Sequence, residues 1–197
     1  MYGLRRIVEP SVLAVSLDDL KSHLRPPDGE DDHQIYKVLA PAAIAAAERR
    51  TGRQFINSTW EFSLDRFPQN CEPIELPISP ATGVVAVSYT STDGDSGAVN
   101  VESLRVDVAR EPATVRPAHG ESWPATRAGD PVVVQFTAGY GEAAEDVPSD
   151  IRAAILLIVE RDYEPPTATA SLNALNNSID SLLEGNSVGD DYIAYAK

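Results

Sequence analysis

The sequence is short of several residue types that carry common chemistry. It has one cysteine, Cys71, and three histidines among its 197 residues. One cysteine cannot form a disulfide within the chain, and neither it nor the histidines lie at the spacing of a zinc-binding motif. The longest apolar runs, 38–47 and 155–159, are far shorter than the roughly 20 residues of a membrane helix. We therefore expect no disulfide, no metal or other cofactor and no membrane contact.

Basic residues are also few. The chain has 16 Lys+Arg against 30 Asp+Glu, which gives a formal net charge of −14. A surface with this charge repels phosphate, so specific binding of nucleic acid is not expected. The first ten residues lack the apolar segment of a secretory signal, and none is predicted. With 43% hydrophobic and 23% charged residues, the chain is long enough for one core or for a core and a smaller lobe.

Two helices are predicted before residue 57. Ser16 has the pattern of an N-cap, and the first helix runs from there to Arg25, before two prolines. A second start signal at Asp31 opens a helix that ends at Gly52. Pro41 falls inside this helix and removes a backbone donor, so we expect a kink or two abutting helices there.

The spacing of apolar residues changes to two from residue 59, where Trp60, Phe62 and Leu64 alternate with polar residues. This alternation predicts a half-buried strand. Further strands are predicted at 74–76, 84–90, 99–101, 104–108, 114–116 and 132–137. These strands follow one another at short intervals and are separated by Pro, Gly and Asp-Gly turns, which indicates an antiparallel sandwich or small barrel.

A helical pattern returns after Pro148 and ends before Pro165. Residues 166–197 are rich in Ala, Ser, Thr and Asn, with one short amphipathic piece at 175–183, and are predicted to form an arm. The fold class is thus α+β. A helical lobe, with two N-terminal helices and one long C-terminal helix, carries an inserted β-sandwich or small barrel and an extended C-terminal arm. The predicted domains are 1–57, 58–140, 141–165 and 166–197.

Two short segments match the sequence motifs of catalytic sites. Residues 94–97, Gly-Asp-Ser-Gly, match those around a protease nucleophile, with His33 and Asp65 earlier in the chain. Their position between alternating strands indicates a hairpin loop instead. Residues 185–189, Gly-Asn-Ser-Val-Gly, match a hydrolase elbow but follow a helix and precede no histidine, which favours a helix C-cap. We therefore expect no enzymatic activity.

The only basic cluster is formed by Arg49, Arg50 and Arg53, at the end of the second predicted helix. Two of these charges suit the negative end of the helix dipole. Arginine is also favoured at protein interfaces. The cluster is therefore a candidate for either dipole compensation or ion pairs at a subunit interface.

The order of segments resembles that of the head-tail connector (adaptor) proteins of tailed phages, including their gene transfer agent counterparts. The resemblance covers about residues 10–164. It rests on motifs that are weak singly but occur in the same order. These are Leu17-x-x-Leu20-Lys21-x-x-Leu24-Arg25, Glu48-Arg49-x-Thr51-Gly52-Arg53, Leu64-Asp65-x-Phe67-Pro68, Ile74-Glu75-Leu76-Pro77, Pro117-Ala118-x-Gly120-x-x-Trp123-Pro124, and 136–141 followed by Val147-Pro148. The last nine residues depart from the family, because they are acidic and apolar rather than basic.

The resemblance implies a virion protein of the head-tail neck, assembled in the bacterial cytoplasm. It implies a ring, dodecameric if it follows the portal, that lies beneath the portal protein, extends the DNA channel and offers a platform to a tail-side neck protein. DNA would pass without specific binding. We expect portal contacts in the arm and tail-side contacts in a sandwich loop at Asp93 and Asp95. The expected portal contacts are Leu182, Leu183, Tyr192, Ile193 and Tyr195.

Three other functions are compatible with parts of the sequence. A β-sandwich that binds a glycan or peptide would expose Trp60 or Trp123 on a concave face. A carboxylate hydrolase would pair Asp65 with Glu61 or Glu75. Another capsid or tail component would share the assembly but not the position.

Overall fold

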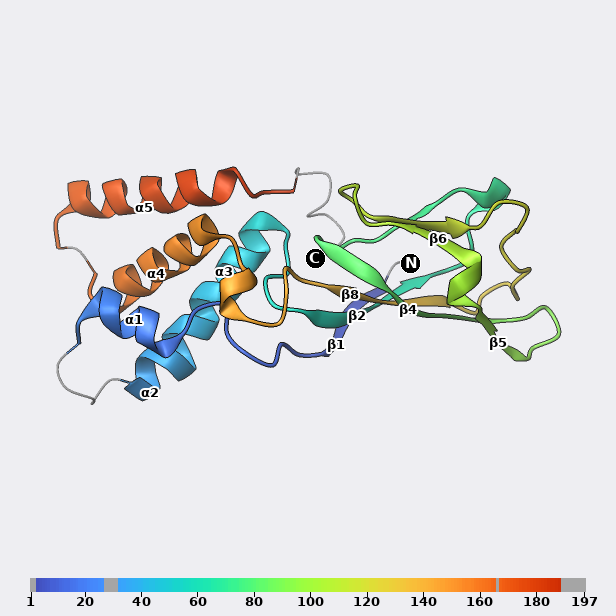
Figure 1. Ribbon diagram of the computed structural model, residues 1–197, viewed down its shortest axis with the longest axis horizontal. Coiled ribbons are helices and arrows are strands. Elements are labelled where there is room, and N and C mark those ends of the chain that lie inside the picture. Colours follow the sequence, from blue (N-terminus) through green and yellow to red (C-terminus); the bar gives the residue numbers. More distant parts are fainter. Residues whose placement is uncertain (1–2, 27–31, 166, 189–197) are drawn as a thin grey trace. The chain divides into compact units, whose positions relative to one another are not determined.

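The computed structural model describes residues 3–26, 32–165 and 167–188, and the chain forms two compact units (Figure 1). The β unit contains residues 3–9 and 57–139, and the helical unit contains residues 10–26, 32–56, 140–165 and 167–188. The predicted α+β class is confirmed, because one unit consists of antiparallel sheets and the other of helices.

The β unit contains two antiparallel sheets. Its strands are β1 (Gly3–Val8), β2 (Ser58–Leu64), β3 (Ile74–Glu75), β4 (Ala81–Thr90), β5 (Ser96–Val99), β6 (Leu104–Asp107), β7 (Thr114–Pro117) and β8 (Val132–Ala138), with short 3-10 turns η2 (Gln69–Cys71) and η3 (Val101–Ser103). The five-stranded sheet has the order β1-β2-β8-β4-β5 and the three-stranded sheet the order β3-β7-β6. The described strands form no closed barrel, so the sandwich is the correct alternative.

The core of the β unit follows from the alternation along its strands. Phe62, Val134 and Val87 lie opposite one another on β2, β8 and β4, and all three are buried. Ile74 and Val115 reach the same cluster from the three-stranded sheet. Because alternate residues face opposite sides of a strand, the intervening residues lie on the outer faces of the two sheets.

The strand predictions have one omission and one error. β1 was not predicted, since its adjacent Arg5 and Arg6 interrupt the alternation, and it pairs with β2 more than 50 residues away. The strand predicted at 99–101 is wrong, because β5 ends at Val99 and the chain turns into η3. The Asn100 side chain accepts a hydrogen bond from the Glu102 amide at 3.1 Å, and this local bond favours the turn over a strand.

The helical unit is built from α1 (Leu17–Leu24), α2 (Asp32–Gln34), the π-helical turn η1 (Ile35–Leu39), α3 (Ala40–Thr51), the 3-10 turn η4 (Ala144–Asp146), α4 (Ser149–Tyr163) and α5 (Thr169–Glu184). Ser16 caps α1 as predicted, since its hydroxyl accepts from the Asp19 amide at 3.0 Å. Gly52 ends α3 in the left-handed conformation, with φ of 69°. No helix in the described ranges is long and apolar enough to cross a membrane.

The helix that contains Pro41 is not interrupted, and a π turn precedes the proline. The α2–η1–α3 segment continues through it, and the Ala40 amide bonds to the carbonyl of Ile35, five residues back. Gln34 and Ala40 both keep helical dihedral angles. Proline has no backbone N–H to donate to the preceding turn, and the wider π turn lies where that hydrogen bond is missing.

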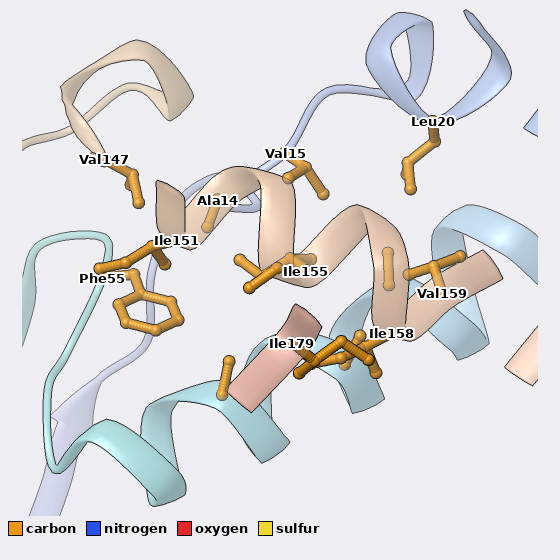
Figure 2. Close-up of a cluster of buried hydrophobic side chains, with 14 of the residues drawn as sticks. Ala14, Val15, Leu20, Phe55, Val147, Ile151, Ile155, Ile158, Val159 and Ile179 are labelled. Carbon is orange, nitrogen blue, oxygen red and sulfur yellow. The ribbon is translucent and has the colours of Figure 1, made fainter. Parts of the chain in front are cut away.

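The core of the helical unit centres on α4 (Figure 2). Ile151, Ile155, Ile158 and Val159 project from α4 toward side chains of several other segments. These partners include Ala14, Val15, Leu20, Phe55 and Ile179. The broad apolar stripe of α4 therefore has neighbours both from the start of the chain and from α5.

Candidate interaction surfaces

The C-terminal helix α5 is longer than the amphipathic piece predicted at 175–183, and it packs against α4 where an extended arm was expected. It covers 16 residues and lies along α4 (Figure 1), where Arg161 on α4 donates to Asn176 at 3.2 Å. Ile179 and Leu183 are 2% and 1% exposed. These two side chains each contribute roughly 1.5–3 kcal/mol by burial, enough to hold a helix whose other face is polar.

The five residues expected to contact the portal therefore have different surroundings. Leu183 is buried in the core of its own unit, and Leu182 is half-buried beside it. Leu183 does not offer its side chain to a partner in this conformation. Tyr192, Ile193 and Tyr195 lie outside the described residues.

Two arginines of the cluster bind other residues of the same chain. Arg50 forms an ion pair with Asp180 on α5, and the Arg53 guanidinium donates to the carbonyl of Asn186 just after α5. Arg49 is exposed. At least two of the three arginines thus tie the end of α3 to the end of α5, a contact that the sequence does not reveal because about 130 residues separate the partners.

The chain beyond α5 is also fixed to α3. The Val188 amide donates to the carbonyl of Thr51 at 2.9 Å, and the Val188 side chain is 7% exposed. The Asn186 side chain donates to Asp150 at the start of α4. The last residues of the described chain are therefore held at a defined point on the helical unit.

Asp93 and Asp95 lie exposed at the tip of the β4–β5 hairpin. The tip is held by backbone bonds from Ser91 to Asp95 at 2.8 Å and from Gly94 to Ser91 at 3.0 Å. Gly94 has a φ of 93°, which favours glycine. The hairpin predicted from the Gly-Asp-Ser-Gly letters is confirmed, and the two aspartates are presented on a short, well-bonded turn.

The hydrolase hypothesis pairs Asp65 with either Glu61 or Glu75, and these two alternative partners lie on different sheets. Glu61 lies on the outer face of the five-stranded sheet, where Arg5 binds it at 2.7 Å. Glu75 lies on the outer face of the three-stranded sheet, on the other side of the sandwich. The described residues also contain no cluster of three side chains suited to a metal ion.

Neither tryptophan forms an open platform for a sugar or peptide. Trp123 stacks on Phe67 with ring centroids 4.7 Å apart, and its indole nitrogen donates to the Glu72 carbonyl at 3.1 Å. Trp60 packs against the core, and the guanidinium of Arg6 lies 5.4 Å from its ring centroid. Both rings therefore have contacts within the β unit.

Arg105 on β6 and Arg116 on β7 are a feature that sequence reasoning missed. They are direct cross-strand partners in the three-stranded sheet, and both are exposed. The alternating pattern around each residue predicts the outward orientation, but only the register of the two strands shows that they face each other.

No known protein family matches the sequence, and no curated protein is similar to it. Solved structures do match. A chain in the neck of an empty gene transfer agent (GTA) particle, computed with C6 symmetry, is 24% identical with a TM-score of 0.76, covering 95% of this chain and 96% of that one. A chain from the neck of a native GTA particle, computed with C12 symmetry, is 25% identical with a TM-score of 0.74, at 95% and 96% coverage.

A chain from the virion of a native GTA particle matches at 24% identity and a TM-score of 0.76, with 94% and 95% coverage. The chain thus has the fold of a structural component of these particles. The resemblance to head-tail connector proteins, gene transfer agent counterparts included, is confirmed at the level of the fold.

Proposed function

We propose that the chain is a structural protein of a particle neck and, more specifically, the head-tail connector (adaptor) subunit. It forms a ring beneath the portal, extends the DNA channel and provides the platform for the tail. The observation that carries this proposal is the match of nearly the whole chain to chains in GTA necks. The C6 and C12 symmetries of those necks support a ring, with twelve copies as the expected number.

The distribution of surfaces supports ring formation. A ring needs a contact between two different faces of adjacent subunits. The chain offers unlike surfaces, because one unit exposes sheet edges and hairpins and the other exposes polar helix faces. A net charge of −14 per copy also suits a channel in which DNA slides past without displacing its counterions.

Portal binding is assigned to the segment that follows Val188, with Tyr192, Ile193 and Tyr195 as its apolar contacts. The anchoring of Val188 beside Thr51 supports this assignment, because it fixes the root of the segment. Many weak contacts made by copies in one ring add to a strong attachment. Tail-side contacts are assigned to Asp93 and Asp95 on their hairpin tip.

The proposal is tested by co-producing the chain with the portal protein of the same particle and viewing the purified complex by electron microscopy. We expect a ring of this chain on one end of the portal. A chain that never joins the portal, or that decorates the capsid or tail instead, would contradict the adaptor role. The second of these results would identify it as another capsid or tail component.

The portal contact has its own test in the variant Y192A/I193A/Y195A. We expect this variant to fold normally and to lose portal binding, since the replaced side chains are the apolar groups of the segment. The matched control D190N/D191N alters the same segment but keeps those groups, and it should bind as the unaltered chain does. Equal portal binding by both variants would refute the assignment.

A further inference from the structure

The outer face of the three-stranded sheet carries an unusual pair of charges. Arg105 and Arg116 lie directly opposite on β6 and β7, which places their Cβ atoms roughly 4.5–5.5 Å apart. Their neighbours Val106 and Val115 face the core, so both arginines face outward. Neither guanidinium has an ion pair or hydrogen bond with another residue in the described parts of the chain.

This arrangement costs stability in the isolated subunit. Like charges directly opposite on neighbouring strands repel each other. The fold does not require both charges, because an exposed strand position accepts threonine or glutamine equally well. A partner that carries negative charge would convert the repulsion into two attractive contacts.

The chemistry of the pair favours a single carboxylate. A guanidinium binds a carboxylate through two parallel hydrogen bonds, and a second guanidinium on the same face adds further donors. Glu75 and Asp107 lie one row away on the same face of the sheet. Their charges would repel the successive phosphates of a nucleic acid, whereas one aspartate or glutamate side chain need meet only the two arginines.

On this basis, and resting on the ring of the proposed function, we infer that Arg105 and Arg116 receive an aspartate or glutamate side chain of the adjacent copy. The chain itself has 30 acidic against 16 basic residues, so a second copy is a rich source of carboxylates. A twofold contact at this patch would set arginine against arginine. The pair therefore suits a head-to-tail contact, which is the kind that closes a ring.

The contact is tested by zero-length carbodiimide coupling in the variant R105K/R116K. This reagent joins an amine to a carboxylate in contact with it, and the natural chain has only three lysines. Rings assembled on the portal from a mixture of ¹⁴N- and ¹⁵N-labelled copies are coupled, digested and analysed by mass spectrometry. The ion pair between Lys21 and Asp32 provides a positive control within each copy.

We expect mixed-isotope peptides that join position 105 or 116 to an aspartate or glutamate, and these peptides also identify the carboxylate that the arginines bind. Coupling of Lys21 to Asp32 without any mixed-isotope product at 105 or 116 would overturn the inference. So would products at 105 or 116 that lead only to the portal, because the occupant would then be a different protein.

Charge reversal gives a second, independent readout. The variant R105E/R116E keeps two like charges opposite each other and places them beside Glu75 and Asp107, so its melting temperature should fall only modestly, while ring formation on the portal, measured well below that temperature, falls at least about tenfold. The control R66E/R110E makes the same change in net charge at two other exposed arginines of the β unit and should assemble normally. The single change R105T should raise the melting temperature by roughly 1–3 °C.

Normal ring formation by R105E/R116E, or a lower melting temperature for R105T, would refute the inference. If the unaltered chain forms no ring on the portal, the proposed function fails. If the unaltered chain and R105E/R116E both form rings, only the arginine contact fails.

Discussion

The two units use their charged side chains differently. In the helical unit, polar side chains connect segments that are distant in sequence: Arg50 forms an ion pair with Asp180, and His23 forms a hydrogen bond with Glu160. In the three-stranded sheet of the β unit, Arg105 and Arg116 face each other and have no such partners within the described residues. The difference indicates that Arg105 and Arg116, unlike Arg50, remain available to a neighbouring molecule.

The cores of the two units also differ in which parts of the chain supply them. The helical core depends on α5, a helix late in the chain that contributes Ile179 and Leu183. The core of the β unit is formed by strands within residues 4–138, with Phe62 and Phe136 at its centre. If this contrast is correct, changes at the C-terminal end should destabilise only the helical unit.

The largest effect is expected from truncation. A chain that ends at Glu164 loses α5 and exposes the apolar stripe of α4, so the helical unit should lose roughly 3–6 kcal/mol of its free energy of unfolding. A chain that ends at Val188 keeps both buried side chains and should be nearly unchanged. Urea unfolding followed by circular dichroism at 222 nm measures both. Equal stability of the two truncated chains would show that α5 adds nothing to the core.

Core substitutions test whether the units unfold separately. Phe136→Ala should cost the β unit about 3–5 kcal/mol, and Ile155→Ala should cost the helical unit about 2–5 kcal/mol. Both tryptophans of the sequence, Trp60 and Trp123, belong to the β unit, so tryptophan fluorescence reports that unit alone. We expect Phe136→Ala to shift the fluorescence transition and Ile155→Ala to shift the helical signal. A common shift of both signals in either variant would mean that the two units unfold together.

Gly139 tests how closely two backbone segments of the β unit must approach each other. Its φ is 144°, and an added Cβ would lie 2.5 Å from the amide nitrogen of Asn57. Gly139→Ala should therefore destabilise the β unit by roughly 1–3 kcal/mol. The control Gly83→Ala places a Cβ in open space on β4 and should change the fluorescence midpoint far less. A midpoint for Gly139→Ala equal to that of the control would show that the backbones can separate at little cost.

The smallest effect is expected at the ion pair that joins α3 to α5. Arg50 and Asp180 have side chains that are 43% and 40% exposed, so their coupling should be only about 0.2–1 kcal/mol. A double-mutant cycle with Arg50→Ala and Asp180→Ala measures it, and added salt should reduce it. A coupling above this range would indicate that the pair belongs to a larger polar network around Asn186.

Local signals predicted much of this fold. Ser16 and Gly52 mark the ends of helices through bonds made within four residues, and the alternation of Trp60, Phe62 and Leu64 fixes which face of β2 is buried. The hairpin at Asp93 and Asp95 followed from its turn residues.

Features that depend on tertiary contacts were not predictable in this way. The polar composition of 167–178 concealed the helix α5, because its stability comes from the stripe on α4 rather than from its own sequence. The partners of Arg50 and Arg53 lie about 130 residues away. Likewise, only the register of β6 and β7 brings Arg105 opposite Arg116.

The π turn at 35–39 connects the length of this helix with the position of Pro41. A π turn holds one residue more than an α turn, so deletion of a residue here would rewind the segment into a regular helix. Regular winding would leave the carbonyl four residues before Pro41 facing the proline ring, which cannot donate to it. A helix shortened by one residue at this turn should therefore lose a backbone hydrogen bond and bend at Pro41, unless Pro41 is replaced at the same time.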